Sequence, residues 1–97
     1  MTLTLAQEAG SSNVRVNAIC PGPVEGRAME SVIVRRARAL RISVAKMRQQ
    51  YLKPAALERM VTASDVSDAV RFLCSEAARS ITGQVIDVSA GFGLAPV

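Results

Sequence analysis

The sequence predicts an α/β fold in which two parallel strands are joined by a long helical connection. Two short runs rich in β-branched residues, 14–20 and 84–88, have the composition of strands. The stretch between them carries apolar residues at helical spacing, and a connection of that length allows both strands to run in the same direction. At 97 residues the chain is long enough for one such domain and too short for two.

The first ten residues have the composition of a helix end. Leu, Ala, Gln and Glu dominate residues 3–9, and Gly10 follows them. Glycine most readily takes the left-handed conformation just beyond a helix, so we expect the helix to end there. About two helical turns are marginal in isolation, and this helix must therefore be held by other segments.

The first strand is predicted over residues 14–20. Its apolar density beyond Val16 is typical of a strand that is covered on both faces. The residues Pro21, Gly22 and Pro23 come next. Because proline cannot donate to a ladder, we expect the chain to leave the sheet at Cys20.

Residues 27–60 predict one amphipathic helix, or two helices broken near Ile42 and Ser43, followed by a connector. Most arginines in this stretch lie off an apolar stripe of helical period, and Pro54 ends the pattern. The stripe consists of Ile33, Ala37, Leu40, Val44 and Met47.

A further helix is predicted over residues 65–75, before the last strand at 84–88. A hydroxyl residue in the segment 62–64 can cap this helix. The acids Asp65 and Asp68 suit the positive end of its dipole. The helix would return the chain to the start of the second strand, which completes a right-handed βαβ crossover.

The positive charge is concentrated in one segment. The formal net charge is +4, and nine of the twelve Lys and Arg residues lie between Arg27 and Arg59, where Glu30 and Glu58 are the only acids. Such a patch is a solvated helix face or an oligomer contact, or else a surface that attracts phosphate or nucleic acid. We favour the first interpretation and expect no nucleic-acid partner, because the chain has few aromatic rings and no recognised nucleic-acid motif.

Cysteine and histidine usage argues against a metal centre. Cys20 and Cys74 are far apart and the chain has no histidine, which also excludes a Ser-His or Cys-His nucleophile. Each cysteine follows an apolar run, so we expect two small buried thiols and a reducing, cytoplasmic location. The sequence shows neither a secretory leader nor an apolar run of about 18 residues, so we expect no membrane partner.

Three motifs together resemble the C-terminal third of short-chain dehydrogenases/reductases. They are Arg15-Val16-Asn17 with Pro21-Gly22-x-Val24, a capped helix that ends Phe72-Leu73-Cys74-Ser75, and Ile81-Thr82-Gly83-Gln84 before the last strand. The resemblance covers nearly the whole chain. It implies the C-terminal portion of a doubly wound, Rossmann-like parallel-sheet domain, a βαβ unit with extra helices. It also implies an NAD(P)-dependent oxidoreductase that transfers a hydride between nicotinamide and a carbonyl or alcohol.

The resemblance implies that Pro21, Gly22 and Val24 border the nicotinamide of NAD or NADP. The Val24 backbone would bond the carboxamide and hold the reactive face of the ring toward the substrate. The alternative is a turn that ends the strand and packs a valine. Family members often have Thr two residues after this Val, where this chain has Gly26, so the correspondence stops at Val24.

The resemblance also assigns roles to the remaining segments. Residues 1–10 match the end of the helix that carries the catalytic tyrosine, and 27–60 match the variable helices that form a substrate lid. Residues 65–75 and 84–88 match elements that often pack against a second subunit, which implies a homo-oligomeric enzyme, a dimer or a tetramer. The sequence leaves open the substrate and the choice between NAD and NADP.

The family's catalytic residues have no counterpart in this sequence. No Tyr-x-x-x-Lys occurs, since Tyr51 is the only tyrosine and Ala55 lies four residues later, and no Gly-x-x-x-Gly-x-Gly loop occurs. Tyr51 is interpreted as a surface or interface residue. We therefore expect the C-terminal fragment of a longer enzyme, inactive by itself. The alternative is a small basic interaction module derived from such an enzyme and devoid of catalysis.

Overall fold

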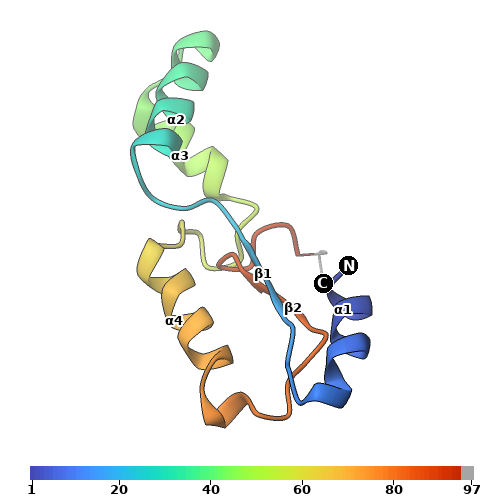
Figure 1. Cartoon of the computed structure of the whole chain (residues 1–97). Helices are drawn as coiled ribbons and strands as arrows, with labels where there is room; N and C mark the ends of the chain where they lie inside the picture. Colours follow the sequence, from blue (N-terminus) through green and yellow to red (C-terminus); the bar gives the residue numbers. More distant parts are fainter. Residues whose placement is uncertain (95–97) are drawn as a thin grey trace.

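The computed structural model describes residues 1–94 and has an α/β architecture (Figure 1). Its two strands are parallel, with Ala18 opposite Val85 and Pro21 opposite Val88. The predicted fold class is confirmed. In chain order the elements are α1 (Thr2–Ala9), β1 (Ala18–Pro21), α2 (Arg27–Leu40), α3 (Val44–Leu52), α4 (Ala63–Leu73) and β2 (Val85–Val88), with short 3-10 turns at Gly10–Ser12 and Glu76–Ala78.

The elements form two parts, a strand pair with a helix on each side and the hairpin of α2 and α3. Helices α4 and α1 lie on opposite sides of the strand pair, and the α2–α3 hairpin extends beyond the ends of the strands (Figure 1). The molecule measures 56 × 29 × 22 Å and its radius of gyration is 17.2 Å, against about 13 Å for a compact chain of this length. None of the helices of residues 1–94 has the length and apolar character that a bilayer crossing requires.

The hydrophobic cluster lies between α2 and α3 and includes Met60, which follows α3. The structure has two helices here, with the break at the predicted position, because Arg41 turns the chain in the left-handed conformation and the Ser43 hydroxyl caps α3. Of the predicted stripe, Leu40 is 60% exposed, since it lies at the end of α2. The buried members of the cluster are Ile33, Ala37, Met47 and Met60.

The first strand is shorter than predicted and lies further along the chain. We expected residues 14–20, whereas β1 spans Ala18–Pro21 and therefore includes a proline. The Gly22 N–H donates to the Val88 carbonyl at 2.9 Å, so the neighbouring Pro21 has its own nitrogen on the opposite edge of β1. The missing N–H of the proline thus removes no hydrogen bond from the β1–β2 ladder.

Before β1 begins, side-chain hydrogen bonds supplement one backbone bond, from the Gly83 N–H to the Val16 carbonyl at 2.7 Å. The Asn17 amide donates to the Ile81 carbonyl at 3.0 Å, and its oxygen accepts from the Gln84 N–H at 3.0 Å. The Thr82 hydroxyl accepts from the Val16 N–H at 3.0 Å. The two sequence motifs around Asn17 and Thr82 therefore contact each other directly, which explains why this segment is extended without being a regular strand.

Two local expectations were wrong. Gly10 is not left-handed, because the chain continues from α1 into a 3-10 turn, and Asn13 takes the left-handed conformation instead (φ 58°). Asparagine tolerates this region better than most residues.

The expectation of two buried thiols is also wrong, since Cys20 and Cys74 are both exposed. Within residues 1–94, a two-stranded sheet with one helix on each side leaves much apolar surface open, as Val85 illustrates at 62% exposure.

The remaining elements lie close to their predicted positions. The helix expected at 65–75 begins two residues earlier and ends two residues earlier, as α4, because Thr62 is its cap. The strand expected at 84–88 is β2, which begins one residue later because the Gln84 N–H is taken by Asn17. The lid segment 27–60 contains α2, α3 and an irregular segment after α3, residues 53–60, which we call the connector.

Replacing Asn17 by leucine should destabilise the chain by about 1–2 kcal/mol, because one part-buried and one exposed hydrogen bond, each contributing about 0.5–1.5 kcal/mol, are lost. Urea unfolding followed by circular dichroism measures this. Gln84→Ala is the matched control, since that exposed amide bonds only the nearby Thr82 carbonyl, and its unfolding free energy should stay within about 0.5 kcal/mol of wild type. Equal losses in the two variants would contradict the role of Asn17.

Candidate functional site

Two loops meet at the carboxyl ends of the strands. Residues 22–26 follow β1 and residues 89–93 follow β2, and parallel pairing brings both loops to the same edge. In open α/β sheets this edge is where ligands bind. Of the predicted site residues, Pro21 ends β1, and Gly22 and Val24 are half-buried in the first loop.

Gly22 is required by close contact between the loops. A Cβ atom built at this position would lie 2.8 Å from both Cα and Cβ of Ser89. Real side chains do not approach so closely, so any larger residue must push the loops apart. Glycine is therefore needed here because the two loops are close together, and not because the backbone conformation is unusual.

A short parallel bridge holds Val24 against Val61. The Val61 N–H donates to the Pro23 carbonyl at 3.0 Å, and the Glu25 N–H donates to the Val61 carbonyl at 2.8 Å. In this pattern the hydrogen bonds of the bridge are made by the backbone groups of Pro23 and Glu25, on either side of Val24. The N–H and C=O of Val24 itself therefore point to the opposite edge.

The two backbone groups of Val24 form a donor–acceptor pair. Among the hydrogen bonds of residues 1–94, neither its N–H nor its C=O has a partner. A primary carboxamide carries one acceptor oxygen and a donor NH₂ group, so it can bond both groups together. The predicted nicotinamide carboxamide fits this pair chemically.

The bridge is anchored by the start of α4. Val61 is 3% exposed, and the next residue, Thr62, caps the helix. The Thr62 hydroxyl accepts from the Asp65 N–H at 3.0 Å while the Asp65 carboxylate accepts from the Thr62 N–H at 2.8 Å, a reciprocal capping box. The loop is thus tied through Val61 to a well-capped helix.

The capping box also perturbs Asp65. The backbone N–H of Thr62 holds the pKa of Asp65 below its ordinary value and outweighs the opposing effect of desolvation, and the Thr62 hydroxyl and Arg59 lower it further. Arg59 lies 3.8 Å from the carboxylate. The Asp65 carboxylate is therefore a structural group that stabilises the loop support in its ionised form.

A pocket of about 330 Å³ opens beside the Val24 loop. Its walls come from the loop, α2, α3 and the connector, so it lies between the candidate cofactor loop and the α2–α3 hairpin. An ion pair between Arg48 and Glu30 crosses from α3 to α2 at this pocket. The lining residues are Glu25, Gly26, Glu30, Arg48, Leu52, Glu58, Arg59 and Met60.

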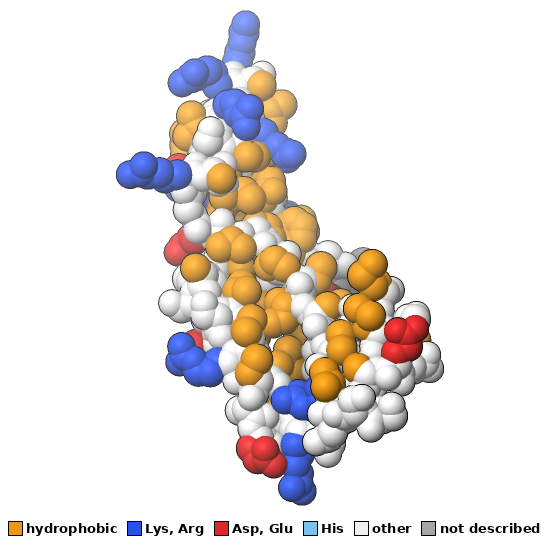
Figure 2. Space-filling view, viewed as in Figure 1, with side chains coloured by type: hydrophobic (Ala, Val, Ile, Leu, Met, Phe, Trp, Pro, Cys, Tyr) orange, Lys and Arg blue, Asp and Glu red, His pale blue; other side chains and the backbone are white. Residues whose placement is uncertain are grey.

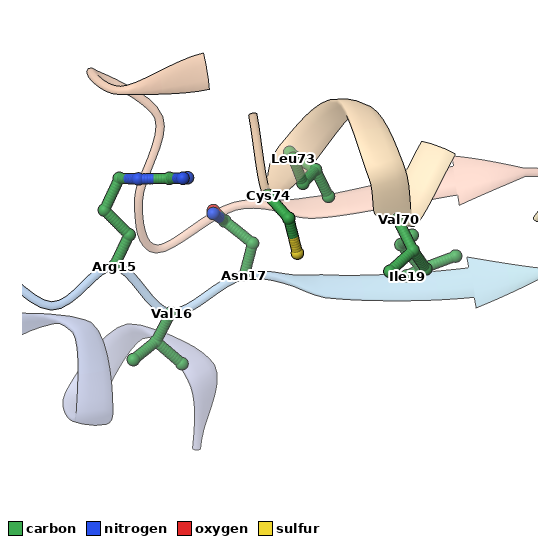
Figure 3. Close-up of a pocket in the computed structure, with 7 residues that line it drawn as sticks. All are labelled: Arg15, Val16, Asn17, Ile19, Val70, Leu73 and Cys74. Carbon is green, nitrogen blue, oxygen red and sulfur yellow. The ribbon is translucent and has the colours of Figure 1, made fainter. Parts of the chain in front are cut away.

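A second pocket, of about 460 Å³, lies between α4 and the chain that leads into β1 (Figure 3). Arg15 and Asn17 line it, and both donate to the Ile81 carbonyl. Val16 points toward α1, away from Val70 and Leu73 of α4 (Figure 3). This pocket lies at the amino end of β1, so it is separate from the loop at Val24.

The sequence indicated the residues of a candidate loop and gave little sign of the residues that support it. The motif indicated Pro21, Gly22 and Val24, and the hydroxyl cap indicated where α4 begins. No local signal marked Val61 or Ser89, because their contacts with the loop join segments far apart in the sequence. The apolar character of Val61 and its place directly before the cap are the only hints that the sequence offers.

Comparisons with known proteins agree with this geometry. A family model described as enoyl-(acyl carrier protein) reductase matches residues 1–93. The chain is 37% identical over 93 residues to the enoyl-(acyl-carrier-protein) reductase (NADH) of Haemophilus influenzae, a match that covers 96% of this chain and 32% of that protein. It is 33% identical over 87 residues to the 7alpha-hydroxysteroid dehydrogenase of Escherichia coli K12, covering 90% of this chain and 30% of that protein.

A solved structure shares the architecture. A short chain dehydrogenase family protein from Francisella tularensis superposes with a TM-score of 0.83 at 29% identity, over 95% of this chain and 38% of that one. The chain therefore spans about a third of the length of the curated relatives it matches.

Substitution of Gly22 by alanine should destabilise the chain by about 1–3 kcal/mol, because its methyl group must displace Ser89. Gly10→Ala is the control. Gly10 has a helical φ of −60° and a Cβ built there has nothing within 4 Å, so this change should be neutral or stabilising by up to about 1 kcal/mol. Urea denaturation measures both, and an unchanged stability of Gly22→Ala would refute the close contact.

Asp65→Asn should lower the melting temperature at neutral pH. Because the folded-state pKa of Asp65 lies below the unfolded value of about 3.8, its stabilising effect is present above that value. It is lost as the pH falls through the folded value. Melting curves recorded from neutral pH downward should therefore converge for variant and wild type in acid, and a constant difference at every pH would count against the carboxylate's role.

Proposed function

Because the chain belongs to the short-chain dehydrogenase/reductase family, we propose that it supplies the nicotinamide loop and the substrate lid of an NAD(P)-dependent oxidoreductase. Bound nicotinamide supplies hydride transfer to or from a carbonyl or alcohol carbon. The observation that carries the proposal is the outward donor–acceptor pair of Val24, held in place by the Val61 bridge.

The proposed role of the loop is orientation. The Val24 N–H and C=O would hold the carboxamide at two points, which fixes the face of the ring that meets the substrate. Gly22 keeps this loop against Ser89, and Val61 resists its withdrawal from the sheet edge. Pro21 restricts the backbone directly before the loop, so little freedom remains for the chain to lose on binding.

The α2–α3 hairpin is the proposed lid over a small-molecule carbonyl or alcohol substrate. It projects from the same edge of the sheet as the loop (Figure 1), and the pocket beside Glu25 separates the two. Arg48 and Glu30 neutralise one another there. Glu25, Glu58 and Arg59 also line the pocket, so it remains charged beyond this pair.

We propose that this chain does not catalyse turnover by itself. Tyr51, its only tyrosine, packs against Phe92 with ring centroids 6.3 Å apart, and its own ring centroid lies 5.3 Å from the Arg36 guanidinium carbon. This is a packing role, and the general acid would come from a part of the enzyme outside these residues. A homo-oligomeric enzyme and a cytoplasmic location stay predictions of the sequence.

The second candidate function is a basic interaction module. Arginine and lysine side chains crowd the outer end of the hairpin (Figure 2). Among the described residues, only Arg48 and Arg59 of the cations at 27–59 form ion pairs. The others, apart from Arg36 over the Tyr51 ring, are available to an acidic partner, and their attraction to it would weaken as salt is added.

The two functions differ in where a nicotinamide cofactor perturbs the chain. In amide NMR spectra of the 97-residue chain, NADH should shift the signals of Val24, Glu25 and Val61. AMP, which lacks the nicotinamide, should leave those signals in place. Shifts confined to the arginine-rich hairpin with both ligands, and abolished by moderate salt, would reject the cofactor loop and favour the interaction module.

A further inference from the structure

We infer that residues 89–93, which we call the strap, fix the position of the α2–α3 hairpin relative to the loop at Val24. The strap follows β2 and ends near Pro54, the residue that leads out of the hairpin. That the hairpin is a substrate lid rests on the proposed function. Its attachment by the strap depends only on the contacts described below.

The strap forms a small backbone ladder with the connector after α3. Phe92 and Ala55 make an antiparallel bridge. The hydrogen bonds that join the two segments run from Ala56 N–H to Gly91 C=O at 3.3 Å, from Leu57 N–H to Ala90 C=O at 2.9 Å, and from Gly93 N–H to Pro54 C=O at 3.3 Å. Ala55 is 1% exposed within this ladder. The connector is therefore held by several bonds at the point where the hairpin leaves the rest of the fold.

Side chains extend the attachment into the hairpin itself. The Phe92 ring lies 6.3 Å from the Tyr51 ring of α3, at an interplanar angle of 36°. The Arg36 guanidinium of α2 lies over the same tyrosine ring at 5.3 Å. Arg36, Tyr51 and Phe92 thus form one continuous set of contacts from α2 through α3 to the strap, of the aromatic and cation–π kind.

The other end of the strap touches the candidate cofactor loop. Ser89 is the residue against which a Cβ at Gly22 would collide. A turn in which the Phe92 N–H donates to the Ser89 carbonyl at 3.0 Å connects this contact to the ladder. A single short segment therefore contacts both the loop and the hairpin.

The hairpin needs such an attachment because its other connection is weak. It leaves the loop through Gly26, whose φ is 153° and where a Cβ would have no atom within 4 Å. Its hydrophobic cluster lies between its own helices, and Met60 of the connector is the one buried member from outside them. Without the strap, the hairpin could swing about Gly26 and the connector, since few buried contacts would oppose that motion. Gly91 and Phe92 are accordingly positioning residues for the lid.

The glycines of the strap provide a matched test. Gly91 and Gly93 have nearly equal φ values, 78° and 77°, so alanine suffers the same backbone strain at both. A Cβ at Gly91 would lie 2.5 Å from the Ala56 Cβ, whereas one at Gly93 has nothing within 4 Å. Gly91→Ala should push the strap off the connector, and Gly93→Ala should not.

The position of the hairpin can be read from a distance between spin labels. One label is placed on Arg38→Cys, in the last turn of α2, and the other on the exposed native Cys74 beyond α4, with Cys20→Ser in all samples. Electron double resonance should give one narrow distance distribution in the parent and in Gly93→Ala. In Gly91→Ala the distribution should become at least about twofold broader. Equal widths in Gly91→Ala and Gly93→Ala overturn the inference.

A rescue variant separates the steric contact from general damage. Ala56→Gly removes the nearest atom that the new methyl group meets and leaves contacts of 3.1 Å to the Ala56 nitrogen and 3.3 Å to Leu94 Cδ1, so the double variant Gly91→Ala with Ala56→Gly should regain most of the narrow distribution. If Gly91→Ala loses its helical circular dichroism, Phe92→Ala carries the test, because it removes the Tyr51 contact and leaves the strap backbone intact. An unchanged width in Phe92→Ala would then overturn the inference.

These measurements use no cofactor, so their outcome is independent of the nicotinamide titration. A broadened distribution in Gly91→Ala together with no response of Val24 to NADH would leave the strap established and remove the cofactor role. The reverse pair of results would keep the cofactor loop and remove the strap as its link to the hairpin.

Discussion

Parallel pairing of β1 with β2 is the constraint from which the rest of the structure follows. Parallel neighbours cannot be joined by a tight turn, so the chain must cross from the end of one strand to the start of the other. That crossover contains α2, α3 and α4. The same pairing sets both strand ends at one edge, where Gly22 meets Ser89 and where the bridge between Val24 and Val61 forms.

The sequence predicted what depends on local chemistry. The break between α2 and α3, the hydroxyl cap of α4 and the parallel direction of the strands could all be inferred, because capping residues and apolar periodicity act within a few positions. The side-chain hydrogen bonds of Asn17 could not be inferred, since their partners Ile81 and Gln84 lie more than 60 residues away. The motif indicated Val24, but only the bridge explains why its backbone groups face outward.

The errors have a common physical origin in the small amount of buried surface. Burial of Cys20 and Cys74 was expected from apolar neighbours, yet strands need cover on both faces before such neighbours are enclosed. The buried hydrophobic residues are divided among the hairpin, the connector after α3 and the strand–helix unit, and none of the buried residues in 1–94 is polar or charged. This scattered burial accompanies the elongated shape and makes each loop contact important for the stability of the whole chain.

Pro21 has a consequence for anything that associates with the open edge of β1. Within residues 1–94 that edge faces away from β2, and the proline nitrogen points toward it without a hydrogen to donate. A strand that added there could find a donor at Ile19 but none at Pro21, where only the carbonyl could bond it. The proline therefore removes one donor from any ladder that forms on this edge, directly before the loop that contains Val24.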